Sequence, residues 1–306
     1  MNQGSSRMWK DIVRDKYLYL FLLPGLIFFV LFKYAPLYGE IIAFKDFRIM
    51  DGIWGSEWAG LKHFDRLFSD RDFWIILRNT LLLNLYSILF VFPAPIVLAL
   101  LLNEVRSHWF KRSLQNMLYL PHFISWVVLG GVIISILSPS TGLVNIILSK
   151  VFGITPIYFM ASPFWWPIVF TLSSIWQTAG WGTILYLAAM GNIDPQLYEA
   201  AKIDGASKLR QIFHVTLPGI RGTIAILLIL QMGKVMDVGF EQVFNLQNSA
   251  VFSVADVIST YVYRMGLLGA QYSYATAVGL FQGIIGLILV LLVNKAIKSM
   301  GEGGLW

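Results

Sequence analysis

Long apolar runs dominate the chain, and short polar stretches separate them. Residues 81–102 hold no charged side chain in 22 positions, and no Lys, Arg, Asp or Glu occurs at 113–149 or 151–193. A helix needs about 20 mostly apolar residues to cross the hydrocarbon core of a membrane. The pattern therefore predicts an all-α integral membrane protein with six transmembrane helices, at 17–34, 81–102, 118–137, 166–190, 219–238 and 274–293.

The composition agrees with a chain that spans a membrane. Hydrophobic residues make up 57% of the chain and charged residues 13%, whereas soluble domains carry about 25% charged residues. These values argue against a soluble enzyme and against a disordered chain. The net charge of +6 is expected from basic cytoplasmic loops, and we expect no nucleic-acid partner. The absence of cysteine excludes a disulfide, a thiolate metal site and a cysteine nucleophile.

The density of basic residues predicts the orientation. With the N-terminus inside, the inner segments hold 13 Lys and Arg in 71 positions, and the outer segments hold 10 in 112. Because cytoplasmic loops are enriched in Lys and Arg, both termini are expected in the cytoplasm. Residues 17–306 would form a single transmembrane domain behind the cytoplasmic segment 1–16. The inner segments are 1–16, 103–113, 192–221 and 293–306.

The loop between the fourth and fifth predicted spans, residues 192–218, has the pattern of two short helices. Asp194 is placed to cap the first helix, and Pro195 suits its first turn because no N–H is needed there. Gly205 permits the turn that must follow. A second helix is expected from Ser207 to His214, with Pro218 ending it and starting the next span.

The same loop resembles the coupling motif of type I ABC importer permeases. That motif is Glu-Ala-Ala, three residues, Gly, nine residues, an aliphatic residue, one residue and Leu-Pro. Val215 departs from it slightly, since the family usually has Ile there. The Asp-Gly-Ala sequence at 204–206 resembles the carbohydrate-importer branch, which includes maltose-transporter subunits. The coupling residues that the resemblance implies are Glu199, Ala200, Ala201, Asp204, Gly205, Leu217 and Pro218.

The resemblance also implies a mechanism and a set of partners. Such a chain, in a bacterial cell membrane, forms half of the pathway for a carbohydrate, with an oligosaccharide expected. A second homologous permease completes a heterodimer, two ATP-binding subunits drive it, and an extracellular solute-binding protein delivers the sugar. The sequence contains no Gly-x-x-x-x-Gly-Lys-Ser/Thr pattern. We therefore expect no enzymatic activity and no cofactor on this chain, with ATP and Mg²⁺ bound by the partner ATPases.

Polar and aromatic residues in an otherwise apolar span are candidates for the sugar path. Gln177 is costly in lipid, so it is expected to face the interior of the helix bundle. Gly180 suits close helix packing equally well, so a packing role and a pathway role both remain open. Lys234 stands three residues before Asp237, a spacing that lets the two pair on a helix face. The pathway candidates are Trp176, Gln177, Gly180, Trp181, Thr183, Gln231 and Lys234.

Three other function classes compete with a sugar importer. A membrane-embedded enzyme would need clustered catalytic groups, which the charge-free spans lack, and the histidines show no metal-ligand spacing. A secondary transporter usually has carboxylates or broken helices near the membrane midplane, and no predicted span has an acidic residue at its middle. An importer of a non-sugar solute would share the same coupling loop. Only two carbohydrate-like features argue against that last alternative. They are Asp-Gly-Ala at 204–206 and the pattern of Gly60-Leu61, Phe64, Phe73 and Asn79-Thr80 ahead of the second span.

Overall fold

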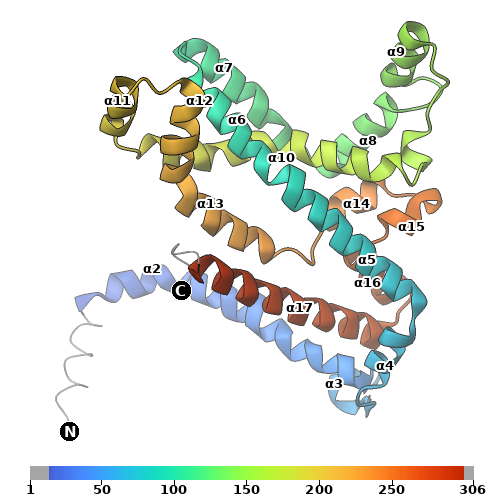
Figure 1. Ribbon diagram of the computed structural model, residues 1–306. Helices are drawn as coiled ribbons and strands as arrows, with labels where there is room; N and C mark the ends of the chain where they lie inside the picture. Colours follow the sequence, from blue (N-terminus) through green and yellow to red (C-terminus); the bar gives the residue numbers. More distant parts are fainter. Residues whose placement is uncertain (1–13, 300–306) are drawn as a thin grey trace.

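The computed structural model describes residues 14–299, and most of these residues are helical (Figure 1). Four helices in this range are long and apolar enough to cross a membrane. A bent helix pair makes a fifth candidate span. The 27-residue helix α10 (Trp165–Gly191) is as long but less apolar than these four. The four long helices are Lys16–Phe44, Arg71–Glu104, Lys208–Met232 and Tyr272–Ser299, the last being α17.

Three of these long helices contain a π-helical turn that ends two residues before a proline: Pro36, Pro93 or Pro218. In each, the residue before the proline donates its N–H to the carbonyl five residues back, as Leu217 does to Ile212. A proline ring would otherwise clash with the carbonyl four residues back. Their segments are α2 (Lys16–Phe29), η1 (Val30–Tyr34) and the 3₁₀ segment η2 (Ala35–Phe44); α5 (Arg71–Tyr86), η3 (Ser87–Val91) and α6 (Pro93–Glu104); and α12 (Lys208–Gln211), η6 (Ile212–Thr216) and α13 (Leu217–Met232).

This local structure corrects two sequence predictions. Pro218 does not end a helix, because the π turn η6 lets the helix continue from Lys208 to Met232. The first helix likewise continues past the predicted end at residue 34 as far as Phe44. The first predicted outer segment, residues 33–78, therefore begins inside a helix.

The predicted span at 118–137 is not one straight helix. It is divided between a helix that starts at His108 and a second helix, and the two meet at a bend of 103°. Ile124 is extended at the bend, and the Ser125 hydroxyl accepts a hydrogen bond from the Val128 amide to begin the second helix. The segments are α7 (His108–Tyr119), η4 (Leu120–Phe123) and α8 (Trp126–Ile136).

Short elements gather at the end of the molecule away from α11 (Pro195–Ile203) (Figure 1). Two of them pair as an antiparallel ladder, in which Lys45 faces Trp58 and Asp46 faces Glu57. The elements are β1 (Lys45–Asp46), α3 (Gly52–Gly55), β2 (Glu57–Trp58), α4 (Lys62–Ser69), α9 (Leu143–Phe152), η5 (Phe159–Ala161), α14 (Phe240–Leu246), η7 (Ser249–Val251), α15 (Phe252–Ala255), α16 (Ile258–Val262) and η8 (Tyr263–Leu268).

The interior packs helices that are far apart in the sequence. The segment η2 lies along α17, and the Phe47 amide donates to the Ser273 hydroxyl at 2.9 Å. Helix α10 packs along α6, and its buried Trp166 donates its indole N–H to the Leu246 carbonyl at 2.9 Å. By contrast, no side chain of α2 is buried. Within the first long helix, it is therefore η2 and not α2 that packs against the rest of the fold.

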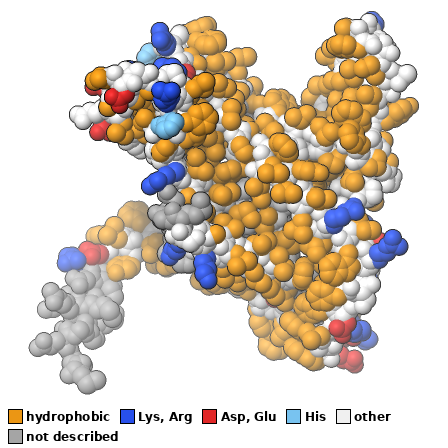
Figure 2. Space-filling view, viewed as in Figure 1, with side chains coloured by type: hydrophobic (Ala, Val, Ile, Leu, Met, Phe, Trp, Pro, Cys, Tyr) orange, Lys and Arg blue, Asp and Glu red, His pale blue; other side chains and the backbone are white. Residues whose placement is uncertain are grey.

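The surface is mostly apolar (Figure 2). Exposed Leu, Ile, Val and Phe side chains occur along nearly every long helix. Charged and histidine side chains gather over α11 and α12 in the same view. A wide apolar surface with charges at its ends suits a protein surrounded by lipid.

Candidate functional site

The loop 192–218 folds into two capped helices. The Asp194 carboxylate accepts the Gln196 amide at 2.9 Å and caps α11, and Pro195 occupies its first turn. At the other end Gly205 has φ +71°. Its N–H bonds the Lys202 carbonyl at 3.0 Å, and the next N–H bonds the Ala201 carbonyl at 2.8 Å. This pair of bonds is a Schellman motif, which requires a left-handed residue at the position of Gly205.

Several contacts fasten this loop to the helices behind it. The Tyr198 hydroxyl lies 3.0 Å from the Thr216 hydroxyl, which ties α11 to η6. Gln211 is buried and donates to the Ala206 carbonyl at 2.9 Å. Lys208 forms an ion pair with Glu104 at 2.9 Å, which joins the start of α12 to the end of α6. The two helices are therefore fixed to the transmembrane helices as a unit.

The outward face of this loop combines apolar and charged groups. Glu199 and Ala200 are exposed, and Glu199 takes part in no ion pair among residues 14–299. Isoleucine 203 is 87% exposed, an unusual position for an apolar side chain at the polar end of a membrane protein. The other exposed apolar side chains of the loop are Leu197, Leu209 and Phe213. Such a patch beside charges is typical of a protein–protein contact.

The remaining coupling candidates differ in their exposure. Ala201 is partly buried, Asp204 is the exposed C-cap of α11, and Pro218 is exposed at the start of α13. Leu217 packs in a core cluster with Tyr186 and Ile220.

The candidates on α10 separate into packing residues and exposed aromatics. A Cβ atom on Gly180 would lie 1.9 Å from the Leu118 carbonyl oxygen, so Gly180 allows α7 to approach α10. Thr183 is fully buried and donates to the Gly180 carbonyl at 2.6 Å. Gln177 is also buried and donates to the Ile124 carbonyl at 3.4 Å, next to the bend between η4 and α8.

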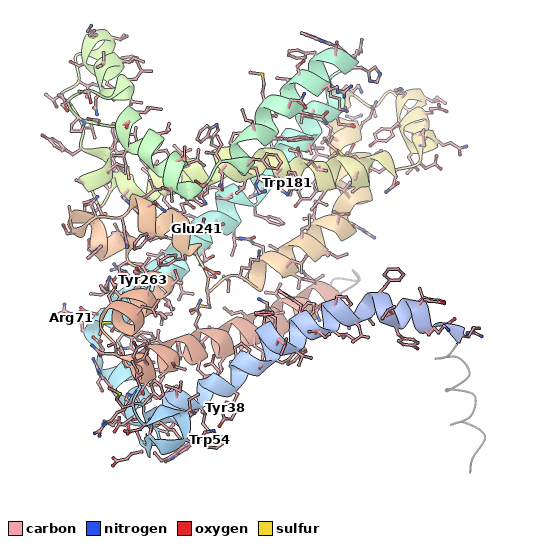
Figure 3. The ribbon with its side chains drawn as sticks, turned by 180° about the vertical axis from the view of Figure 1, so that it is seen from behind. Tyr38, Trp54, Arg71, Trp181, Glu241 and Tyr263 are labelled. Atoms are coloured by element: carbon pink, nitrogen blue, oxygen red, sulfur yellow. The ribbon has the colours of Figure 1, made fainter. Side chains whose placement is uncertain are left out.

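Two aromatic side chains of α10 are about half exposed, on different sides of the helix. Trp181 (Figure 3) stacks on the His122 ring, with the ring centroids 4.8 Å apart and the planes 4° apart. Phe123 meets the same indole edge-on at 5.6 Å. Trp176 takes part in no such stack among the described residues. The sequence prediction missed His122 and Phe123, although a histidine next to Pro121 inside an uncharged span is a signal of a broken helix.

The candidates at and beyond the end of α13 are not on one helix face. Gln231 donates to the Ser87 hydroxyl at 3.4 Å. Lys234 is exposed in a turn beyond the end of α13. The predicted pair of Lys234 with Asp237 is absent within residues 14–299, and the Asp237 carboxylate accepts the Gly239 amide at 3.0 Å. In the same range, no group of His, Asp and Glu side chains converges as a metal site would require.

A family model described as the binding-protein-dependent transport system inner membrane component matches residues 91–300. The chain belongs to this family. It is therefore a multi-pass permease component of an importer, and this confirms the resemblance drawn from the Glu199–Pro218 motif. Permeases of this family are transporters and not enzymes.

Relatives and solved structures agree with this assignment. The chain is similar to the polygalacturonan/rhamnogalacturonan transport system permease protein YteP of Bacillus subtilis (strain 168), at 48% identity over 98% of this chain and 93% of the relative. It is similar to a chain of a bacterial ABC transporter involved in the import of the acidic polysaccharide alginate, at 44% identity and a TM-score of 0.88, over 96% of this chain and 99% of that chain. A bacterial alginate ABC transporter in complex with an alginate pentasaccharide-bound periplasmic protein matches at 43% identity and a TM-score of 0.90, over 98% of this chain and 100% of that one.

Proposed function

We propose that this permease forms half of the membrane pathway of an ATP-driven importer for an acidic oligosaccharide. The observation that carries the proposal is the match over 98% of the chain, at 43% identity, to a permease crystallised with an alginate pentasaccharide-bound periplasmic protein. A second homologous permease would complete the pathway. An extracellular binding protein would deliver the sugar, and two ATPase subunits would bind the ATP and Mg²⁺.

The α11–α12 loop is the proposed contact for one ATPase subunit. Its exposed Ile203, Leu209 and Phe213 offer apolar surface, and Glu199 offers a carboxylate without an intramolecular partner among residues 14–299. The contacts to Thr216 and Glu104 would pass a movement of the loop to α13 and α6. A loop that bent freely would lose that movement before it reached the membrane.

The proposal includes six membrane crossings with both termini in the cytoplasm. The four long apolar helices, the bent pair α7–α8 and α10 together supply six. Loop 192–218 and the Glu104 end of α6 then lie on the cytoplasmic side, where the density of Lys and Arg is higher. The short elements at the other end would meet the binding protein.

For the sugar path we propose the exposed Trp181, with His122 and Phe123 supporting it. A flat indole held by a stacked imidazole offers a face on which the C–H surface of a sugar ring can stack. Trp176, Gln231 and Lys234 are proposed as further pathway residues. Lys234 forms no ion pair among residues 14–299 and would attract an acidic sugar.

The test is transport by the complete complex in vesicles, with its binding protein. Alginate or galacturonate pentasaccharides should stimulate ATP hydrolysis and be taken up, whereas maltopentaose should do neither. Glu199→Ala should weaken ATPase docking about tenfold or more, because a charge-assisted contact contributes about 1.5–3 kcal/mol. Asn192→Ala, an exposed change in the same loop, is the matched control. Equal uptake of the neutral sugar would refute the substrate class, and full coupling in Glu199→Ala would refute the docking role.

A further inference from the structure

A groove of about 700 Å³ runs between the α5–η3 helix and the first half of α10. On α5–η3 the lining residues recur every four positions, so they form one continuous strip along the helix. The two apolar walls are Leu82, Tyr86 and Phe90 on one side and Ile168, Leu172 and Ile175 on the other. Trp181 and His122 are not part of this lining, so the groove is separate from the proposed sugar path.

Apart from Arg78 and the Tyr86 hydroxyl, the polar side chains that line the groove already have hydrogen-bond partners. The Asn79 amide donates to the Asp256 carbonyl at 3.1 Å. The Thr171 hydroxyl donates to the Pro167 carbonyl of its own helix at 2.8 Å. A sugar needs several hydrogen-bond partners, and an apolar wall of this kind leaves its hydroxyl groups unpaired. The groove therefore fits an apolar chain.

One cation stands at the end of the groove nearest the start of α5. Arg78 donates to two neutral oxygens, the Ser253 carbonyl at 2.8 Å and the Asn79 side-chain oxygen at 3.0 Å. The nearby Asp256 carboxylate is held by Arg264 in a bidentate ion pair. None of the ion pairs within residues 14–299 includes Arg78, and its side chain is exposed. The guanidinium is thus available to an anion such as a phosphate.

The length of the groove matches one half of a membrane. From Arg78 to Phe90 the helix rises about 18 Å, and one leaflet of the hydrocarbon core is about 15 Å thick. The cation at one end and the apolar channel of leaflet length beside it match the two parts of a phospholipid, which are its anionic phosphate and its acyl chain. We propose that this groove binds a phospholipid of the leaflet away from the α11–α12 loop, with its phosphate on Arg78 and an acyl chain between α5–η3 and α10.

The first test measures lipid binding to the complete transporter, stripped of lipid in detergent and titrated with dioleoyl phosphatidylglycerol. Native mass spectrometry counts the lipids that stay bound. Arg78→Gln should weaken the tightest binding about tenfold, because a charge-assisted contact is lost. Arg71→Gln, two turns earlier on the same helix and outside the groove, should leave binding unchanged. Equal losses of lipid binding in both variants would mean that binding depends on general surface charge, and this result would overturn the site.

The second test locates the acyl chain with a phosphatidylglycerol that carries a diazirine on that chain. Labelled peptides should include residues 82–90 and 167–175. Leu172→Trp should fill the groove and abolish this labelling, whereas Leu185→Trp, an exposed position on another side of α10, should not. Labelling that does not respond to Leu172→Trp would overturn the proposal. So would crosslinks in the assembled transporter from a photoreactive residue at 172 to the second permease instead of to lipid.

Discussion

At the scale of single residues, two glycines serve different purposes. Gly205 supplies a left-handed backbone, and the space around its missing side chain is open. Gly180 has an ordinary backbone but almost no space, because α7 lies against it. A substitution at the first strains a turn, and a substitution at the second forces two helices apart. The two positions therefore predict distinguishable defects.

We expect Gly205→Val to uncouple transport from ATP hydrolysis while the protein inserts in the membrane at normal levels. A β-branched residue resists φ near +71°, so the Schellman turn after α11 would distort. Uptake and ATP hydrolysis in vesicles measure the loss. Gly205→Asn should retain most activity because asparagine tolerates the left-handed region. Gly222→Ala, in open space within α13, controls for the loss of a glycine.

For Gly180→Ala the expected defect is lower stability. The added methyl group overlaps the Leu118 carbonyl, and overpacking of this kind costs about 1–3 kcal/mol. The midpoint of thermal unfolding in detergent should fall, with transport falling only in proportion to folded protein. Gly279→Ala, with nothing within 4 Å of the new Cβ, should keep the wild-type midpoint. A normal midpoint with lost sugar selectivity would instead support a pathway role for Gly180.

At the scale of elements, an aspartate joins three helices at the end away from the α11–α12 loop. Asp70 caps α5 through the Asp72 amide at 2.9 Å. Its other oxygen accepts hydrogen bonds from the hydroxyls of Tyr261 at 2.9 Å and Tyr274 at 3.1 Å. Arg66 lies over the Tyr274 ring at 4.2 Å. This network connects α5, α16 and α17.

The network predicts a sensitivity to acid. Burial by itself raises the pKa of the Asp70 carboxyl, but the hydrogen bonds from Tyr261, the Asp72 amide and Tyr274 outweigh burial and hold this pKa below its usual value. A carboxyl with a lowered pKa stabilises the fold above its unfolded pKa of about 3.9, and this contribution is lost as pH falls through the folded value. The thermal midpoint should therefore drop between pH 7 and about pH 3.

The Asp70→Asn variant isolates this contribution. Asparagine caps a helix as well as aspartate does, but it has no charge to lose. Its midpoint should lie below wild type at pH 7 and change less on acidification. Asp51→Asn, an exposed carboxylate in the same region, should follow the wild-type curve. An identical pH response in Asp70→Asn would mean that other groups control acid stability.

Hydropathy predicts the existence of these elements better than their ends. The charge-free stretch around α10 gives bounds of 166–190, close to the observed Trp165–Gly191. Pro218 misleads, because the π turn that accommodates it is not visible in an apolar pattern. The break at Ile124 has a local signal in Pro121 and Ser125. The stack of Trp181 on His122 depends on how α10 crosses the bend, which no local pattern specifies.

At the scale of the whole molecule, the orientation can be tested with single cysteines, since the natural chain has none. Ser140→Cys, before α9, should react with an impermeant thiol reagent on intact cells. Ser207→Cys, at the cap of α12, should react only after the cells are opened. Both positions are exposed, so access to the reagent depends on membrane side. The opposite labelling pattern would invert the topology.

The motif of loop 192–218 was enough to predict the family, and the loop's caps could be predicted residue by residue. Asp194, Pro195 and Gly205 act through neighbours within a few positions, so their roles follow from local chemistry. The lipid groove and the Asp70 network could not be predicted in this way. Each unites residues from segments that are distant in the sequence, such as Arg78 with Ser253 and Asp70 with Tyr274.

The packing of η2 on α17 has a consequence for the making of the protein. The first long helix, Lys16–Phe44, is synthesised well before α17. Until α17 is made, η2 has only its contacts with short elements such as α3, α4 and β1, and no side chain of α2 is buried within residues 14–299. The first helix must therefore stay in the bilayer without this packing partner, which its largely apolar surface permits. A ribosome that stops before α17 therefore releases a chain whose first helix lacks the helix along which it packs.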